Sequence, residues 1–341
     1  MGEIVKAKSK DLKLLLGILA GEEVPAEIPE AVVDLAERAM VLEVIAAREE
    51  VRAISERAHK AYLSQAALGA LRLKELKEIA EAMAEAGIEI MVQKGMAYGL
   101  MFETGGPTRA MADIDLLVRD TDYQKTGAVM HGLGYEEGFA KQIAHAKGHH
   151  ERQFTREGRL VEIHRAFLRG RRITVDYDAL WQRAETIDTD GVHCLRMSAE
   201  DTFVYHCFHW GMHEFVLAGL RSAWEARRLC IEDGPDMRLA ALRAKEWGTA
   251  RTNWCAMRIT NWCFEDTFSK DMLAMFEPQQ VVKPLLEKYV IEPSIESLTD
   301  PGFLPRHVQL FRKALLVDSL KNAASYLLWY AGAMVETRGK S

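Results

Sequence analysis

The feature that most constrains the fold of this chain is a pair of aspartates, Asp113 and Asp115, at the start of the apolar run LLV. Successive side chains of a strand point to opposite faces of a sheet, so both carboxylates share one face and Ile114 lies on the other. Two carboxylates at the edge of a core repel each other and are costly to bury unless a cation lies between them. The stretch 113–118 therefore predicts a strand that presents a cation-binding site at one end.

A later stretch, RLVEIHRAF, supplies a further carboxylate in the same kind of pattern. Glu162 and His164 alternate with aliphatic residues, so the acid and the histidine share one strand face. From this strand phase we predict that Glu162 is the third metal ligand, and that His164 supports a ligand from the same face. Glu151 and Glu157 stay open as alternatives for the third ligand.

Mg²⁺ suits such a set of carboxylates, because this hard ion is bound by one or two carboxylates together with substrate phosphates. We expect Mg²⁺ as the cofactor, with Mn²⁺ as an alternative. Lys94 and Gly95 stand between a predicted strand and a predicted helix, where backbone N–H groups and the helix dipole favour an anion. Lys94 and Arg109, four residues before Asp113, are the candidate cations for the phosphates.

The order of the predicted elements indicates an α+β fold. Residues 1–69 are predicted as an N-terminal helical region, residues 70–196 as a small core with a mixed sheet, and residues 197–341 as a C-terminal helical domain. The core is predicted to contain strands at 88–93 and 113–118, a helix that begins at Asp120 or Thr121, and a hairpin that turns at Glu157-Gly158.

Helices are also predicted outside the sheet. The stretch 29–63 is rich in Ala and Glu and has no helix breaker, whereas 71–87 ends at Gly87, a natural C-terminal cap. Ser198 is the predicted cap of a further helix. We predict a loop over 292–305 and a last helix over 305–335. The tryptophans at positions 210, 224, 247, 254 and 262 are predicted to be core residues.

The ordered set of motifs resembles the polymerase β-like nucleotidyltransferase superfamily, in which a glycine motif precedes a helix, a paired acid lies on the next strand and a third acid lies on a later strand. The closer similarity is to the uncharacterised nucleotidyltransferase family. The matching positions are Lys94-Gly95, Arg109 through Val118, and Glu162-Ile163-His164. Lys-Gly stands here where the wider superfamily usually has Gly-Ser or Gly-Gly.

The resemblance implies Mg²⁺-dependent transfer of a nucleoside monophosphate, with AMP as the first candidate, from a nucleoside triphosphate to a small-molecule, peptide or protein acceptor, with release of pyrophosphate. It implies that Asp113, Asp115 and Glu162 are the metal-binding and catalytic residues. It also implies that the nucleotide and its phosphates meet Lys94, Gly95, Arg109 and His164. Two alternatives stay open, a non-catalytic nucleotide- or partner-binding module on the same fold and a phosphotransferase.

Several histidines and arginines fall outside these motifs. His206, His209 and His213 share one face of a predicted helix, and three interpretations stay open: helix packing, a pocket lined by His209 and His213, or zinc ligation. Two other clusters are predicted to lie in solvated loops. This prediction is preferred to a binding site for His145, His149 and His150, and to a patch for RNA for Arg169, Arg171 and Arg172.

The net charge and the cysteine content limit the classes of partner and compartment that we expect. The formal net charge of −6 gives no general attraction to nucleic acid or to an anionic membrane, so we expect neither as a partner. The five cysteines are odd in number and form no Cys-x-x-Cys pair, which predicts thiols in a reducing compartment. The apolar run near the N-terminus is too short to span a bilayer. We therefore expect a cytoplasmic protein.

Overall fold

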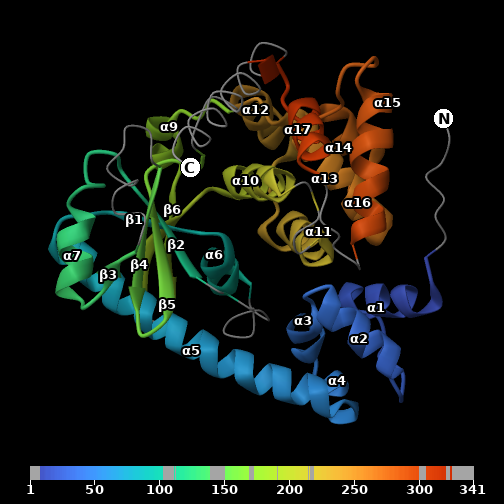
Figure 1. The fold of residues 1–341 in the computed structure, drawn as a ribbon, viewed down its shortest axis with the longest axis horizontal. Helices are drawn as coiled ribbons and strands as arrows, with labels where there is room; N and C mark the ends of the chain where they lie inside the picture. The colour runs from blue at the N-terminus through green and yellow to red at the C-terminus, as the bar shows by residue number, and fades with distance from the viewer. Residues whose placement is uncertain are drawn as a thin grey trace.

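The computed structural model describes residues 8–102, 111, 113–138, 150–168, 173–189, 191–213, 215, 219–298, 305–319 and 323–324. These residues form an N-terminal group of helices, a mixed sheet with its own helices, and a C-terminal group of helices (Figure 1). This arrangement confirms the α+β class predicted from the sequence. Among the described helices, none combines the length and the apolar character that a membrane span requires.

The N-terminal helices are shorter than the sequence predicted. The stretch 29–63 is helical, as predicted, but it is interrupted, because Met40 has a positive φ of 59° and Ser55 has an extended backbone. Ser55 instead caps the longest helix, since its Oγ accepts a hydrogen bond of 3.3 Å from the backbone N–H of Ala58. The helices are α1 (Lys10–Ala20), α2 (Glu30–Arg38), α3 (Leu42–Ala46), α4 (Glu49–Ile54) and α5 (Glu56–Glu85).

The sheet has the order β3-β4-β5-β2-β1-β7-β6 in the described residues. β2 pairs in parallel with β5, and β1 in parallel with β7, whereas the other neighbours are antiparallel. The strands are β1 (Ile90–Gln93), β2 (Asp113–Val118), β3 (Glu136–Glu137), β4 (Glu151–Arg156), β5 (Arg159–His164), β6 (Glu185–Thr189) and β7 (Val192–Arg196). The strands predicted at 88–93 and 113–118 and the hairpin at Glu157-Gly158 are confirmed, while β6 and β7 were not predicted.

Helix α5 passes from the N-terminal group along the sheet and contacts β7 (Figure 1). It contains most of the predicted helix 71–87 and is followed by Gly87, whose φ of 70° is left-handed, as a C-terminal cap requires. Its buried residues Leu76, Ile79 and Met83 recur at helical spacing. The expected boundary between residues 69 and 70 falls inside this helix.

Two short helices follow the inner strands. Helix α6 (Lys94–Met101) begins directly after β1, as the sequence predicted. The helix predicted to begin at Asp120 or Thr121 instead begins later, as α7 (Thr126–Gly132). Turns precede it, because the backbone N–H of Lys125 bonds to the carbonyl of Asp122 at 2.9 Å rather than four residues back.

The C-terminal part is helical, as predicted. Ser198 caps its first long helix, because its Oγ accepts from the backbone N–H of Asp201 at 3.3 Å. The helices of this part and the short helix before it are α9 (Tyr177–Gln182), α10 (Ala199–Met212), α11 (Gly219–Arg228), the π-helix η1 (Leu229–Asp233), α12 (Met237–Trp247), α13 (Ala250–Cys263), α14 (Lys270–Met275), α15 (Lys283–Leu286), the π-helix η2 (Glu287–Ile291), α16 (Glu292–Ser297) and α17 (Arg306–Leu315).

Two expectations for the end of the chain are corrected. The segment 292–297 is helix α16 rather than a loop, because its proline lies in the first turn, where no backbone N–H is required. The predicted helix 305–335 does not run on unbroken, since α17 ends at Leu315 and Asp318 turns back to α13. The carboxylate of Asp318 accepts from the backbone N–H groups of Ala250 and Arg251 at 2.7 and 2.9 Å. Most of the chain after 319 lies outside the described residues.

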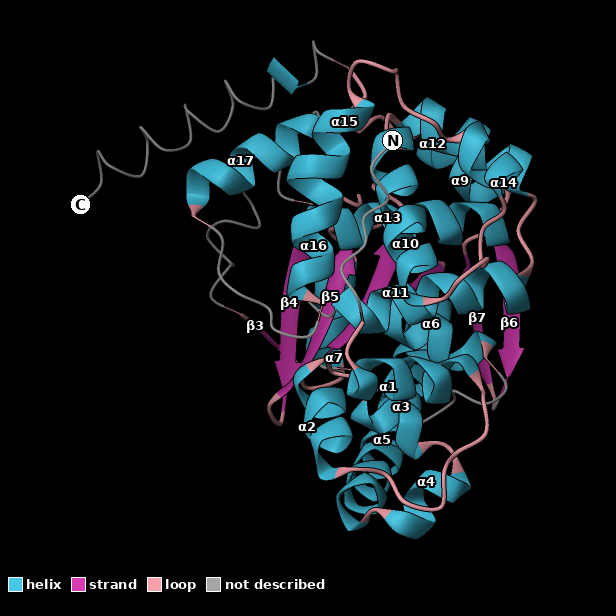
Figure 2. Cartoon of the chain, turned by 90° about the vertical axis from the view of Figure 1, so that its right-hand side faces the viewer, coloured by secondary structure: helices cyan, strands magenta, loops and turns pink. Residues whose placement is uncertain are grey.

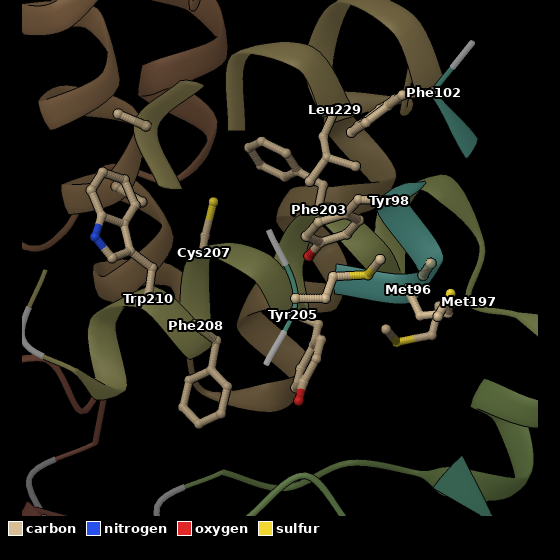
Figure 3. Packing of buried hydrophobic residues seen from close by; sticks show 14 of the residues in the cluster. Met96, Tyr98, Phe102, Met197, Phe203, Tyr205, Cys207, Phe208, Trp210 and Leu229 are labelled. Atoms are coloured by element: carbon tan, nitrogen blue, oxygen red, sulfur yellow. The ribbon is translucent and has the colours of Figure 1, made fainter. Parts of the chain in front are cut away.

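The core joins the sheet to the C-terminal helices. Figure 2 shows the sheet behind α6, α10 and α11. Buried side chains connect α6 to α10, among them Met96, Tyr98, Phe203 and Tyr205 (Figure 3). The predicted tryptophans are core residues: positions 210, 247 and 254 are buried, and 224 and 262 pack against the core. This packing fixes α10 over one face of the sheet.

Candidate active site

Strand register places polar side chains in a line across the sheet. Gln93 of β1 lies opposite Asp115 of β2, Asp115 lies beside Glu162 of β5, and Glu162 lies opposite Gln153 of β4. Residues paired in this way point to the same face of a sheet. We call Gln93, Asp115, Glu162 and Gln153 the acid row. Asp113 shares the face of Asp115, two residues earlier on β2.

The carboxylates of the acid row are held by nearby donors. Lys94 Nζ lies 2.6 Å and His164 Nε2 lies 2.9 Å from the same oxygen, Oδ1 of Asp115. His164 Nε2 is also 3.5 Å from Oε2 of Glu162, while Gln153 Nε2 donates to Oε1 of Glu162 at 2.8 Å. Asp115 is only 3 % exposed. A buried carboxylate thus receives its hydrogen bonds from groups that can carry positive charge.

Burial and neighbouring charges shift the pKa values of the acidic and basic groups of the site in opposite directions. Burial raises the pKa of Asp113 and the nearby carboxylates of Asp115 and Glu162 raise it further, so this group ionises less readily than usual. Burial also acts to raise the pKa of Asp115, but the hydrogen bond from His164 and the charge of Lys94 bring it well below the usual range. Burial lowers the pKa of His164, yet bonding to Asp115 and Glu162 outweighs this and raises it to about 9. The ionised carboxylate of Asp115 is therefore stabilised by the two cationic groups that contact it, Lys94 and His164.

Lys94 and Gly95 begin helix α6, where the sequence predicted an anion cradle. Lys94 has a left-handed φ of 49°, a conformation that costs a non-glycine residue about 1 kcal/mol or more. Its ammonium group points to Asp115 in this structure. Burial acts to lower the pKa of Lys94, but the negative charges around it, that of Asp115 included, keep the pKa above its ordinary range.

Helix α10 brings a histidine to the same region. The pKa of His209 is lowered well below its ordinary value, first by burial and then by the charges of Lys94 and His213, against the opposing pull of Asp115. These interactions place His209 within electrostatic reach of the acid row. His213 packs beside it, with ring centroids 4.9 Å apart, and the buried ring of Tyr205 lies 5.9 Å from His209.

His206 has a different role. Its Nε2 lies 2.9 Å from the carbonyl oxygen of Ser222, and its Nδ1 lies 3.0 Å from the hydroxyl of Tyr98. A carbonyl oxygen only accepts, so Nε2 carries a proton and donates it to Ser222, while Nδ1 shares a hydrogen bond with the hydroxyl of Tyr98. Of the three histidines on this helix face, His206 therefore joins α6, α10 and α11, whereas the pKa of His209 responds to the charges of Lys94 and Asp115.

The two alternative acids lie elsewhere. Glu157 is in the hairpin turn, and its exposed carboxylate pairs with Arg159 at 2.9 Å. Glu151 lies opposite His164 at the far end of the hairpin, and its Oε2 is 3.8 Å from Nδ1 of His164. Strand phase alone had favoured Glu162, which the register places next to Asp115.

Four residues near the site were not found from the sequence. Gln93 and Gln153 join the acid row through strand register, which is not a local property of the sequence. Tyr205 is a buried residue of α10. Arg72 is a buried residue of α5, and its charge lowers the pKa of Asp113. The one available signal was Gln93 itself, a polar residue at the end of the apolar strand IMVQ.

Some predicted residues cannot be placed. Arg109 lies in the segment 103–110, outside the described residues. The same holds for His145 and His149, in the segment 139–149, and for the arginines at positions 169, 171 and 172.

The residues that are described fit a divalent cation. Ligand atoms of Asp115, Glu162 and His164 lie within 4.8 Å of one another. The ammonium of Lys94 already contacts Oδ1 of Asp115. Carboxylate oxygens are the donors that Mg²⁺ and Mn²⁺ prefer. Asp115, Glu162 and His164 are therefore a group that could hold a divalent metal ion.

Comparisons with known proteins give one family. The chain is similar to the solution structure of the antibiotic-resistance factor ANT(2'')-Ia, with 14% identity and a TM-score of 0.36 over 55% of this chain and 96% of that one. No curated protein matches the chain. Residues 29–265, more than two thirds of the 341 residues, match the family described as uncharacterised nucleotidyltransferase. The chain therefore belongs to the uncharacterised nucleotidyltransferase family.

Proposed function

We propose that this chain transfers a nucleoside monophosphate, with AMP as the first candidate, from a nucleoside triphosphate to a small-molecule, peptide or protein acceptor. The observation that carries the proposal is the parallel register of β2 and β5, which sets Glu162 beside Asp115, with Asp113 on the same face. Three carboxylates in such an arrangement are suited to hold divalent cations at a triphosphate.

Asp113, Asp115 and Glu162 would hold Mg²⁺, or Mn²⁺ in its place. When bound, the metal offsets the charge of the triphosphate and lowers the pKa of the acceptor hydroxyl. His164 orients Asp115 by donating from Nε2 to Oδ1, at 2.9 Å. Gln153 fixes Glu162 in the same way, by its hydrogen bond of 2.8 Å.

The chemical step is a displacement at the α-phosphorus. A bond forms between the acceptor oxygen and the α-phosphorus, the bond to the bridging oxygen breaks, and pyrophosphate leaves with that electron pair. The proton of the acceptor hydroxyl passes to Glu162, the candidate base. Lys94 and Arg109 would neutralise charge on the phosphates, next to Gly95 at the start of α6.

The acceptor would bind between the sheet and α10. His209 lies within electrostatic reach of Lys94 and Asp115, and His213 packs against it. Pockets for small ligands form preferentially between such layers. We further propose that the protein works in the cytoplasm, an expectation supported by five cysteines that are all free thiols.

One observation favours a second candidate, a non-catalytic binding module. Lys94 places its own ammonium 2.6 Å from Asp115, so the chain supplies a cation to the acid row. Product analysis separates the candidates. The protein is incubated with each nucleoside triphosphate, Mg²⁺ and a cell extract that supplies small-molecule, peptide and protein acceptors. Pyrophosphate is the product that supports nucleotidyl transfer, a nucleoside diphosphate indicates a phosphotransferase, and neither product indicates a binding module.

A further inference from the structure

A second group of metal-binding side chains lies beyond the acid row, on the other nitrogen of His164. Nδ1 of His164 is 3.8 Å from Oε2 of Glu151, and Nε2 of His150 is 3.4 Å from the same oxygen. All three ligand atoms lie within 4.8 Å of one another. His150, Glu151 and His164 thus converge on one point from two strand ends.

The sheet itself holds these residues together. Glu151 and His164 are directly opposite in the antiparallel pairing of β4 and β5, so their side chains share a face. The pairing extends one residue further, because the backbone N–H of Arg165 donates to the carbonyl of His150 at 2.9 Å. The position of His150 is therefore fixed by the backbone next to β4.

The spacing of the ligand atoms suits a four-coordinate transition metal. Zinc lies about 2.0 to 2.2 Å from nitrogen and oxygen ligands, so tetrahedral geometry separates those ligands by about 3.4 Å. The observed separations of 3.4 and 3.8 Å are close to this value. They exceed the usual length of a direct hydrogen bond. Two imidazoles and one carboxylate also form a known donor set for zinc.

The second nitrogen of His164 completes the arrangement. A histidine that binds a metal through one ring nitrogen commonly donates its other N–H to a carboxylate, which fixes the tautomer and the ring orientation. Nε2 of His164 lies 2.9 Å from Oδ1 of Asp115, as this pattern requires for a metal on Nδ1. Asp115 is then the outer partner of this second site, that is, the carboxylate that accepts from a ligand histidine without binding the metal itself.

The group is also open to an incoming ion. The side chains of His150 and Glu151 are 20% and 29% exposed, whereas that of His164 is 5% exposed. We propose that His150, Glu151 and His164 form a second metal site, separate from the three carboxylates, for a borderline transition-metal ion such as Zn²⁺ or Co²⁺. A metal bound there fixes the His164 ring that donates to Asp115, and so links the two sites.

Co²⁺ binding tests the proposal without nucleotide, so its outcome is independent of the proposed transfer reaction. The background is Asp113→Asn/Glu162→Gln, which weakens the carboxylate site. Equilibrium dialysis and Co²⁺ absorption are expected to show one bound ion per chain in this background. His150→Ala and the nearly isosteric Glu151→Gln are each expected to weaken it at least 10-fold.

Two further variants sharpen the test. Asp115→Asn, added to the same background, is expected to weaken Co²⁺ binding about 10- to 100-fold through loss of the outer partner. His193→Ala is the matched control, because His193 pairs with Asp188 at 3.1 Å on an exposed strand face and is expected to leave binding unchanged. Circular dichroism checks that each variant is folded. The proposal is overturned if the background binds no Co²⁺, or if folded His150→Ala and Glu151→Gln variants bind it as tightly as the background.

Discussion

Nζ of Lys94 lies 2.6 Å from Oδ1 of Asp115, so the chain itself places a positive charge on the carboxylate at the centre of the acid row. His164 reaches the same oxygen at 2.9 Å. A divalent cation that binds Asp115 through Oδ1 has to share this oxygen with Lys94 or displace it, and one that binds through Oδ2 is repelled by the nearby ammonium.

Replacing Lys94 by methionine is expected to strengthen Mn²⁺ binding in the absence of nucleotide. The variant keeps an unbranched side chain that is one atom shorter and removes the ammonium that competes for Asp115. A gain of about 10-fold corresponds to about 1.4 kcal/mol. Electron paramagnetic resonance of free Mn²⁺ measures the change. Lys125→Met is the control, because Lys125 makes an exposed pair of equal length, 2.6 Å, with Asp122. Weaker Mn²⁺ binding by Lys94→Met than by wild type would show that Lys94 does not compete with the metal.

Replacing Gln93 by methionine is expected to raise the free energy of unfolding. Gln93 is fully buried, and in the described residues neither its amide oxygen nor its amide nitrogen has a hydrogen-bond partner. An unpaired buried polar group costs about 1 to 3 kcal/mol, which an apolar side chain of similar size avoids. Urea denaturation is the measurement. Proteins tolerate such a cost in stability at functional sites. Gln93 is in such a position, because it lies opposite Asp115 in the acid row.

Gln153→Met is the matched control for this measurement. Gln153 occupies the same row, but its amide donates to Glu162 at 2.8 Å, so this change removes a hydrogen bond and is expected to lower stability. Equal losses of stability in the two variants would mean that the amide of Gln93 is paired in solution.

Replacing Tyr98 by phenylalanine is expected to lower the free energy of unfolding by about 1 to 2 kcal/mol, because the buried Nδ1 of His206 loses a hydrogen bond of 3.0 Å. Metal binding at the acid row is expected to stay unchanged, since the ring nitrogens of His206 bond to Tyr98 and Ser222 and thereby join helices. Thermal unfolding and Mn²⁺ titration measure the two effects. A variant that is as stable as wild type but binds Mn²⁺ less tightly would reverse the roles assigned to His206 and His209.

Local patterns predicted the two strands that carry the candidate metal ligands and the faces of those strands. Alternation in DIDLLV and RLVEIH set the phase of β2 and β5, and phase alone put Asp115 and Glu162 on compatible faces. The alternation is a property of neighbouring residues and needs no knowledge of the rest of the fold. The capping signals at Gly87 and Ser198 were predictable for the same reason.

Features that depend on distant contacts could not be predicted. Gln93 joins the acid row only through the register of β1 against β2, and the charges of Lys94 and Asp115 influence His209 only because tertiary packing sets α10 over the sheet. The stretch 29–63 has helix-forming composition throughout, yet Met40 adopts a left-handed backbone between short helices. The last predicted helix ends early, because Asp318 accepts hydrogen bonds from the first backbone N–H groups of α13. In each case tertiary packing outweighs local propensity.

Calorimetry of nucleotide binding tests the central claim most directly. Each nucleoside triphosphate is titrated with Mg²⁺ into wild type and into Asp113→Asn/Asp115→Asn. The matched control is Asp120→Asn/Asp122→Asn, which changes two aspartates with the same spacing that pair outside the acid row, with Arg165 and Lys125. We expect one nucleotide to bind wild type and the control only when Mg²⁺ is present, with binding lost in Asp113→Asn/Asp115→Asn. Equal affinity in all three proteins, or no binding to wild type with Mg²⁺ or Mn²⁺, would contradict the account.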